Sequence, residues 1–359
     1  MERRSFLKKA AVGASVGAIA APALAQAQPT INWRLASSFP KTLDTVFGAA
    51  EVFSKRVAQL TSGKFNIRVF AGGEIVPALQ VMDAVQAGTI EMGHTAPYYF
   101  FGKDPTFAFD CAVPFGMNSR QQTAWYEQGG GKQLLRDFYK DYGIVNFIGG
   151  NSGAQMGGWF RREIKSLNDI KGLKMRIGGY GGRVMQKLGL VPQQIAAGDI
   201  YPSLEKGTID AAEWIGPYDD ERLGLYKVAP HYYAPGWWEP STQFSFYVGV
   251  KEWEKLPKDY QAAIEAASYE AHVYMQAEYD AKNPAALARL LRNGVKLHSF
   301  SKEIMEACYK AANEVNEEEA SKNPKFKKIY EPWKRFRQDQ NQWFSVAEAS
   351  MQNFMITHK

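Results

Sequence analysis

The stretch that decides the fold reads INWRL at residues 31–35, LDTVFGAAEVFSKRVAQL at residues 43–60, FNIRV at residues 65–69 and IEMGHT at residues 90–95. The first and third segments alternate apolar and polar residues, as strands do, and the last is a third strand. The second segment repeats apolar residues at helical spacing, and so do residues 79–85. This order predicts a βαβαβ unit, with helices on the faces of a parallel sheet.

A second α/β half follows Gly149-Gly150. The same alternation of patterns predicts strands at residues 173–177, 192–195 and 209–215, with helices at residues 182–188 and 201–206. The apolar run at residues 145–148 is long enough to carry the chain from one half into the other.

The last third of the chain joins the two halves. We expect the strand at residues 244–250 to return to the first sheet, and the helical segments after it to pack across both halves. The fold class is therefore α/β, with two α/β domains and a long helical C-terminal region. The predicted domains are residues 28–149 plus about 242–280, and residues 150–241 plus about 281–359 with the C-terminal helices.

The first 27 residues have the pattern of an export signal. A basic start is followed by an uncharged Ala- and Val-rich run and by the small residues Ala23-Leu24-Ala25, which is typical of a cleaved secretory leader. Arg3-Arg4 favours the twin-arginine type over an ordinary secretory signal. The mature chain is therefore expected in the periplasm.

Composition excludes several classes of protein. The net charge is +6, of which the leader contributes half, and no block of Lys or Arg supports nucleic-acid binding. The periplasm permits a disulfide between Cys111 and Cys308, but two cysteines so far apart are equally expected as separate buried thiols. The histidines are scattered without the spacing of zinc ligands: His94, His231, His272, His298 and His358.

Candidate binding residues lie at strand ends, where ligands bind in open α/β sheets. Arg176 closes a predicted strand before Gly178-Gly179, and its planar fork suits a carboxylate, although a surface or interdomain ion pair is the alternative. The polar, Gly-rich residues 151–160 can supply amide donors and acceptors, or serve as a hinge.

Two further carboxylates, Glu213 and Glu239, are expected to face the same cleft. They would repel a bound anion unless a cation lay between them, and oxygen ligands suit sodium or calcium. Paired carboxylates beside tryptophans also describe a glycosidase, so this pair leaves both interpretations open.

Taken together, these segments resemble the extracytoplasmic solute receptors of tripartite ATP-independent periplasmic (TRAP) transporters, the DctP-like family, and within it the 2-oxo acid (pyruvate-type) receptors. The resemblance covers essentially the whole chain and rests on residues 33–37, 155–162, 173–176, 199–201, 213–220 and 235–239.

The resemblance implies a binding protein, not an enzyme, with two domains that close like a clamp around a monocarboxylate such as pyruvate. It places the carboxylate on Arg176, and a metal, sodium or alternatively calcium, on Glu213, the backbone oxygen of Trp214 and Glu239. It gives Gln155 a bridging role between metal and ligand, and Asn151 and Tyr99 complete the ligand shell.

The resemblance also implies partners. These are the membrane subunits of a TRAP transporter and a second copy of the chain, reached by the C-terminal helix. The aromatic tail at residues 323–354 fits that role, or it packs on the chain's own domains. A receptor for lactate or a dicarboxylate remains the alternative, and a dicarboxylate would need a second cation, for which Arg161 and Arg162 are the candidates.

Overall fold

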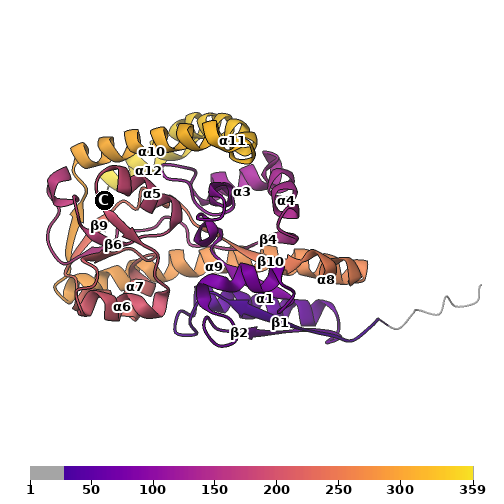
Figure 1. The fold of residues 1–359 in the computed structure, drawn as a ribbon. Helices are drawn as coiled ribbons and strands as arrows, with labels where there is room; N and C mark the ends of the chain where they lie inside the picture. The colour runs from indigo at the N-terminus through magenta and orange to yellow at the C-terminus, as the bar shows by residue number, and fades with distance from the viewer. Residues whose placement is uncertain (1–27, 359) are drawn as a thin grey trace, which may run out of the picture.

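The computed structural model describes residues 28–358, so the predicted leader lies outside the described residues. Two mixed sheets, each with its own helices, stand side by side, and long C-terminal helices run across both (Figure 1). Among residues 28–358 no helix is long and apolar enough to cross a membrane. Cys111 and Cys308 are both buried and unbonded to each other.

The first sheet has the strand order β2-β1-β3-β10-β4. Strand β1 pairs in parallel with β2 and β3, whereas β10 is antiparallel to both β3 and β4. The predicted return of the strand at residues 244–250 to this sheet is therefore confirmed. The strands are β1 (Ile31–Ser37), β2 (Phe65–Phe70), β3 (Met92–Thr95), β4 (Ile144–Asn151) and β10 (Gln243–Gly249).

Helices α1, α2, α4 and α9 (Lys258–Arg292) pack on this first sheet, and each of them has buried apolar residues. In α1, the residues at helical spacing from Val46 to Val57 are the buried ones, as the sequence pattern predicts. All residues of β4 are buried, although it is an edge strand, because α4 and α9 pack on it. The elements are α1 (Val46–Leu60), η1 (Ala78–Gln80), α2 (Val81–Gln86), η2 (Pro97–Phe100), η3 (Pro105–Asp110), α3 (Ser119–Gln128), α4 (Gly131–Lys140) and α8 (Val250–Lys255).

The second sheet has the order β11-β9-β5-β8-β6-β7. Strand β6 is parallel to β7 and β8, while β5 is antiparallel to β8 and β9. The elements are β5 (Trp159–Phe160), η4 (Leu167–Asp169), β6 (Lys174–Arg176), α5 (Gly179–Lys187), β7 (Val191–Gln193), α6 (Ala197–Glu205), β8 (Ala211–Ala212), α7 (Pro217–Leu223), η5 (Leu225–Lys227), β9 (His231–Ala234) and β11 (Lys296–Ser299).

The parallel pairing expected for the βαβαβ unit is confirmed for β1, β2 and β3, but both complete sheets are mixed because β10 and β5 are antiparallel to their neighbours. The chain passes from the first sheet to the second through residues 152–158, and returns through residues 235–242. Strands β5 and β10 therefore enter from the other half and run against their neighbours. The apolar run at residues 145–148 lies within β4, so the crossing falls just after the position that the sequence suggested.

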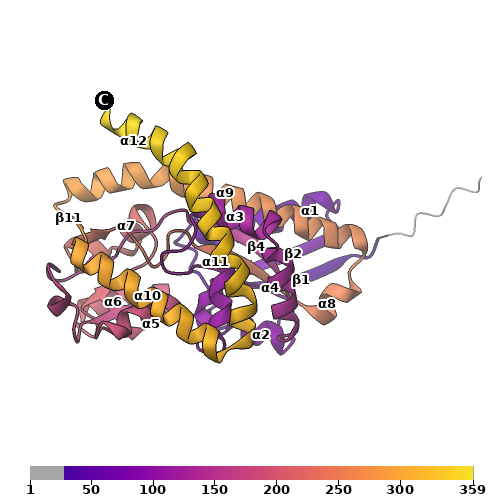
Figure 2. The ribbon, with the colours of Figure 1, turned by 90° about the horizontal axis from the view of Figure 1, so that it is seen from above.

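Helix α9 (Lys258–Arg292) connects the two halves a third time. It contacts α1 and β4 of the first half and α7 of the second, so the expectation that the helical tail packs across both is confirmed. The remaining helices are α10 (Lys302–Lys322), which packs on α5, α11 (Pro324–Phe344), which packs on η3, α3 and α4, and the terminal turn η6 (Ser345–Ala349) with α12 (Ser350–Thr357) (Figure 2).

A buried carboxylate joins these parts. Asp219 in α7 accepts hydrogen bonds from the hydroxyls of Thr45, just before α1, at 2.6 Å and of Tyr279, in α9, at 2.7 Å. Asp219 is fully buried, and burial raises its pKa to about 6, while the two hydroxyls lower it. One carboxyl group therefore links the first half, the second half and the connecting helix.

Asp219→Asn should change how stability depends on pH. The folded-state pKa of about 6 lies above the usual 3.8, so this group stabilises the fold at low pH and the wild type loses that contribution as pH rises through 6. Between about pH 4 and pH 7, the unfolding free energy of the wild type should fall relative to that of Asp219→Asn by on the order of 3 kcal/mol. Urea unfolding followed by tryptophan fluorescence measures this, and parallel pH profiles for the two proteins would contradict it.

Candidate functional site

The predicted site residues are brought to the boundary between the two halves. Arg176 closes β6, Asn151 closes β4, and Glu213 follows β8 by one residue. The crossing segments, residues 152–158 and 235–242, supply two more side chains. All seven predicted residues are buried: Tyr99, Asn151, Gln155, Arg176, Glu213, Trp214 and Glu239.

Arg176 and Glu213 form an ion pair with no exposed surface on either side chain. Arg176 Nη1 donates to the Glu213 carboxylate and, at 2.7 Å, to the Glu213 backbone oxygen, while Nε donates to the Ile195 carbonyl at 3.2 Å. The Gly178 amide donates to the same Glu213 oxygen, Oε1, at 2.9 Å. The guanidinium also lies over the Trp214 ring, 4.8 Å from its centroid.

Glu239 and Gln155 are joined through Thr242. The Thr242 hydroxyl donates to Glu239 Oε2 and accepts a 2.8 Å hydrogen bond from Gln155 Nε2. Gln155 Nε2 also donates to Ser152 Oγ at 3.1 Å. Backbone bonds hold the two crossing segments together, from Gln155 N to the Glu239 oxygen at 3.3 Å and from Ser152 N to the Thr242 oxygen at 3.0 Å.

Two tyrosines of η2 close the site from the first half. The Tyr98 ring packs so closely on Gly178 that a Cβ there would lie 2.4 Å from a ring carbon, so a side chain at this position would push the halves apart. The Tyr99 carbonyl accepts a 2.8 Å hydrogen bond from Gln194, which lies just after β7 in the second half. The two halves are thus in contact around the site, which is closed. A ligand reaches it only if the halves separate.

The site leaves polar atoms of both kinds without partners among the described residues. The unpaired donors are Asn151 Nδ2, Arg176 Nη2 and Trp214 Nε1. The unpaired acceptors are Gln155 Oε1 and Glu213 Oε2. Buried polar groups are normally hydrogen-bonded, so these donors fit an anion and these acceptors fit a cation.

The charges of the two carboxylates support a cation. Burial raises the pKa of Glu239 well above its usual range, and the charge of Glu213 raises it further. Burial also raises the pKa of Glu213, against the lowering effect of Arg176 and of the Gly178 amide. Two buried carboxylates share one guanidinium, so a further positive charge would relieve their repulsion.

The donor set fits an oxygen-bound metal. No group of three or more His, Cys, Asp and Glu residues suited to a metal occurs in residues 28–358, so the candidate ligands are two carboxylates, an amide oxygen and a backbone carbonyl. This set suits sodium or calcium. His231 and His298, which are 67 residues apart in the sequence, are stacked across β9 and β11, with 2.9 Å between Nδ1 and Nε2.

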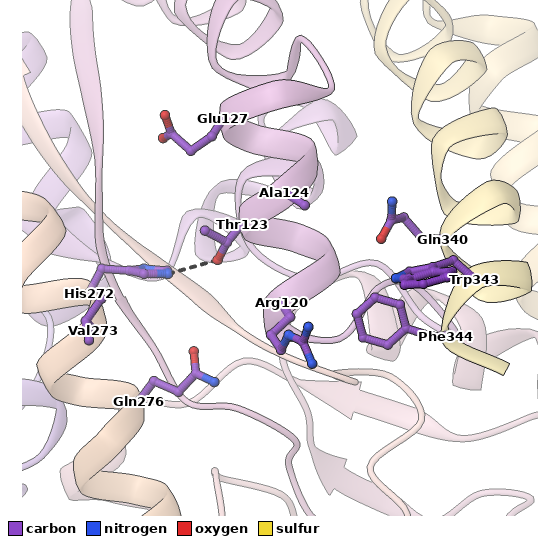
Figure 3. Close-up of a pocket in the computed structure, with 10 residues that line it drawn as sticks. All are labelled: Arg120, Thr123, Ala124, Glu127, His272, Val273, Gln276, Gln340, Trp343 and Phe344. Atoms are coloured by element: carbon purple, nitrogen blue, oxygen red, sulfur yellow. Dashed lines mark hydrogen bonds between the residues drawn. The ribbon is translucent and has the colours of Figure 1, made fainter. Parts of the chain in front are cut away.

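Sequence reasoning missed Thr242 and Ser152. Both are fully or almost fully buried hydroxyls in the crossing segments. The only sequence signal was their position near Glu239 and Gln155, which does not reveal a contact between segments 87 residues apart. Several cavities lie outside the site. One, of about 630 Å³, is lined from both halves by residues including Ser38, Gly72 and Ile195. Another is formed by α3, α9 and α11 (Figure 3).

Known proteins are similar to this chain in sequence and in fold. A monocarboxylate 2-oxoacid-binding periplasmic protein of Nostoc sp. is 49% identical over 360 residues, which is 99% of each chain. A TRAP transporter solute-binding protein of Bordetella bronchiseptica, a mixed-occupancy dimer with copurified calcium and picolinate bound in one site, is 55% identical, with a TM-score of 0.91 over 92% of this chain and 98% of that chain.

Two more solved structures match nearly as well. A TRAP periplasmic solute-binding protein of Colwellia psychrerythraea with bound calcium and pyruvate is 38% identical, with a TM-score of 0.88 over 90% of this chain and 99% of that one. A protein of the same kind from Pseudoalteromonas atlantica with bound sodium and pyruvate is 37% identical, with a TM-score of 0.88 over 92% of this chain and 100% of that one.

A family match agrees with these relatives and with the clamp-like fold. Residues 36–323 match the DctP family, described as bacterial extracellular solute-binding protein, family 7. This match spans both sheets and every predicted site residue. The chain therefore belongs to the bacterial extracellular solute-binding proteins of family 7.

Proposed function

We propose that this chain is a periplasmic receptor that binds a small 2-oxo monocarboxylate, such as pyruvate, together with a sodium or calcium ion, and delivers it to the membrane subunits of a TRAP transporter. The observation that carries the proposal is the buried set of unpaired donors beside unpaired acceptors. An anion and a cation bound side by side would satisfy both. The relatives that bind pyruvate or picolinate with calcium or sodium support the same pairing.

Arg176 fits the role of carboxylate ligand. Its Nη1 and Nε are held by protein oxygens, while Nη2 has no partner among the described residues, so Nη2 is the donor left for a ligand. Asn151 Nδ2 is a second free donor, whose amide is oriented by the 2.8 Å bond from the Gly153 amide to Asn151 Oδ1. These two donors suit the two oxygens of a carboxylate.

The cation completes the charge balance. Arg176 brings one positive charge, and Glu213 and Glu239 bring two negative charges when both are ionised as ion ligands, all of them buried. A carboxylate ligand would add a third negative charge, which a low-dielectric site does not accept without compensation. Gln155 Oε1, Glu213 Oε2, a Glu239 oxygen and the Trp214 carbonyl are the candidate ligands of the ion.

A monocarboxylate is favoured over a dicarboxylate. Arg176 is the only buried Arg or Lys among residues 28–358. The two candidates for a second cationic group, Arg161 and Arg162, are exposed on the outer surface. A second carboxylate would therefore be buried without a positive partner. Lactate, with one carboxylate and a neighbouring oxygen, meets the same constraints and remains the alternative ligand.

The glycosidase interpretation has less support. Glu213 is held by Arg176 and by the Gly178 amide, and Glu239 by Thr242, so both carboxylates are fixed within the protein. The family is one of solute-binding proteins. Hydrolysis of a glycoside that disappeared in Glu239→Gln would favour the enzyme.

We also propose a homodimer formed through the C-terminal helices. Helix α12 extends away from the rest of the chain (Figure 2). The solved relative from Bordetella bronchiseptica is a dimer. The groove between α3, α9 and the end of α11, of about 540 Å³, offers a seat beside Trp343 for the helix of a second copy (Figure 3). At the end of α11, in η6 and in α12, six apolar side chains are at least half exposed. They are Trp343, Val346, Met351, Phe354, Met355 and Ile356.

Arg176→Lys should weaken pyruvate binding at least tenfold, because an ammonium keeps the charge but loses the planar fork. Arg176→Ala should abolish binding, and should also lower the melting temperature because Glu213 loses its buried partner. Calorimetric titration and the ligand-induced rise in melting temperature measure both effects. Arg162→Ala, at an exposed position, is the matched control and should bind as the wild type. Full affinity in Arg176→Lys would refute the assignment.

Removing sodium and calcium should weaken pyruvate binding by the wild type on the order of tenfold or more, because the buried carboxylates then repel the acid. Glu239→Gln removes one of these charges and one ligand, so its acid binding should be weaker in the presence of the ion and should depend less on it. Titration of pyruvate in choline buffer, with and without each ion, measures this. Glu252→Gln, in α8 and far from the site, is the control. Ion-independent binding by the wild type would contradict the proposal.

Deleting residues 345–359 should convert a dimer into a monomer, because the deletion removes most of the exposed apolar face. Light scattering coupled to size exclusion measures the mass of each protein. The double variant Met351→Glu with Met355→Glu tests the same face in the full chain, since both side chains are more than half exposed. A wild-type monomer, or a truncated protein that stays dimeric, would contradict this arrangement.

A further inference from the structure

Thr242 lies where the two crossing segments meet, directly before β10. It is fully buried, and its hydroxyl contacts two of the predicted ion ligands, Glu239 and Gln155. Ser241, its neighbour, is also buried, but its hydroxyl donates to the Met117 carbonyl at 3.2 Å and does not contact either ligand. One of two adjacent hydroxyls is therefore built into the site.

A hydroxyl has a single proton, and the direction of each bond around Thr242 follows from this. Glu239 binds a cation in its ionised form, which only accepts hydrogen bonds, so the Thr242 proton goes to Glu239 Oε2. The lone pairs of Thr242 are then left to face Gln155, which must offer N–H and not C=O. The bond to Glu239 thus decides which end of the Gln155 amide meets Thr242.

Ser152 requires the same orientation of the Gln155 side-chain amide as Thr242 does. Its proton goes to the Gly153 carbonyl at 3.0 Å, so its oxygen also accepts, and it receives a 3.1 Å bond from Gln155 Nε2. Both protons of the Gln155 amide group are therefore used by hydroxyl oxygens. The Oε1 atom is left buried without a partner among the described residues. Only an oxygen can serve as a ligand for a hard cation.

We infer that Thr242 is a positioning residue that, with Ser152, locks the side-chain amide of Gln155 so that its oxygen faces the cation, while it holds one oxygen of Glu239 in place. The inference rests on the proposed function, because it assigns the cation to this site. The inference adds that Thr242, which is not one of the candidate ion ligands, sets the cation affinity.

The test uses Thr242→Val, which keeps the shape of the side chain and removes the hydroxyl. Without that oxygen, the Gln155 amide loses one acceptor and Glu239 loses one donor. The sodium or calcium concentration that gives half-maximal pyruvate binding should rise about tenfold or more, which corresponds to about 1.4 kcal/mol or more. At saturating ion, pyruvate affinity should return to within about threefold of the wild type, because Arg176 and Asn151 are untouched.

Calcium binding without acid provides a second readout. Calorimetry with the metal alone should show weaker binding by Thr242→Val, and Thr242→Ser, which restores the hydroxyl, should recover at least half of the loss on a logarithmic scale. Ser241→Ala is the matched control and should keep the wild-type ion dependence. If Thr242→Val does not fold, Ser152→Ala removes the other acceptor of Gln155 and should shift the ion dependence in the same direction.

The outcomes separate the two proposals. Wild-type protein that binds pyruvate without any ion dependence overturns the proposed function. Wild-type protein with ion dependence, together with an unchanged half-saturating ion concentration in both Thr242→Val and Ser152→Ala, overturns only the positioning role. A lower melting temperature with an unchanged ion dependence shows a purely structural hydroxyl and also overturns it.

Discussion

The structure depends on the burial of one guanidinium. Moving a charged group out of water costs several kcal/mol unless hydrogen bonds and an opposite charge replace the lost solvent. For Arg176 these come from the Ile195 carbonyl, from the carboxylate and carbonyl of Glu213, and from the face of the Trp214 ring. The ends of β6 and β8 and the loop after β7 must all be in place to supply them. The second half of the chain is therefore organised around a guanidinium of which only Nη2 has no partner among the described residues.

Two of the three segments that connect the halves also carry part of the site. Residues 152–158 and 235–242 are tied to each other by backbone bonds, and they contribute Gln155, Glu239 and Thr242. Any rotation of one half against the other must bend these segments. Such a rotation would also displace the oxygens that face the ion. Opening of the clamp and disassembly of the ion site are thus coupled by the path of the chain.

Local pattern was sufficient to predict the elements of the first βαβαβ unit, but not the strands β5, β9 and β11 or the direction of strand pairing. The alternation at residues 31–35 and 65–69 and the helical spacing of α1 correspond to what the structure contains. Alternation carries no information on strand direction, so the antiparallel β5 and β10 were missed. The position of Arg176 at a strand end was predictable, as was the need for a counter-charge near Glu213 and Glu239. Thr242 was not, because its role arises only when a second segment supplies Gln155.

The arrangement of charges also sets an order among the bound species. With Arg176 paired to Glu213, Glu239 has no positive partner of its own, and burial together with the charge of Glu213 raises its pKa well above the usual range, so the site without ligands favours a proton on Glu239. An acid anion that arrives alone meets a guanidinium that Glu213 already neutralises, in a buried environment where Coulomb interactions are poorly screened. A cation that arrives first displaces the proton of Glu239 and places a positive charge beside the acid. Binding of the ion before or with the acid is therefore the physically favoured sequence, and the two ligands stabilise the closed state together.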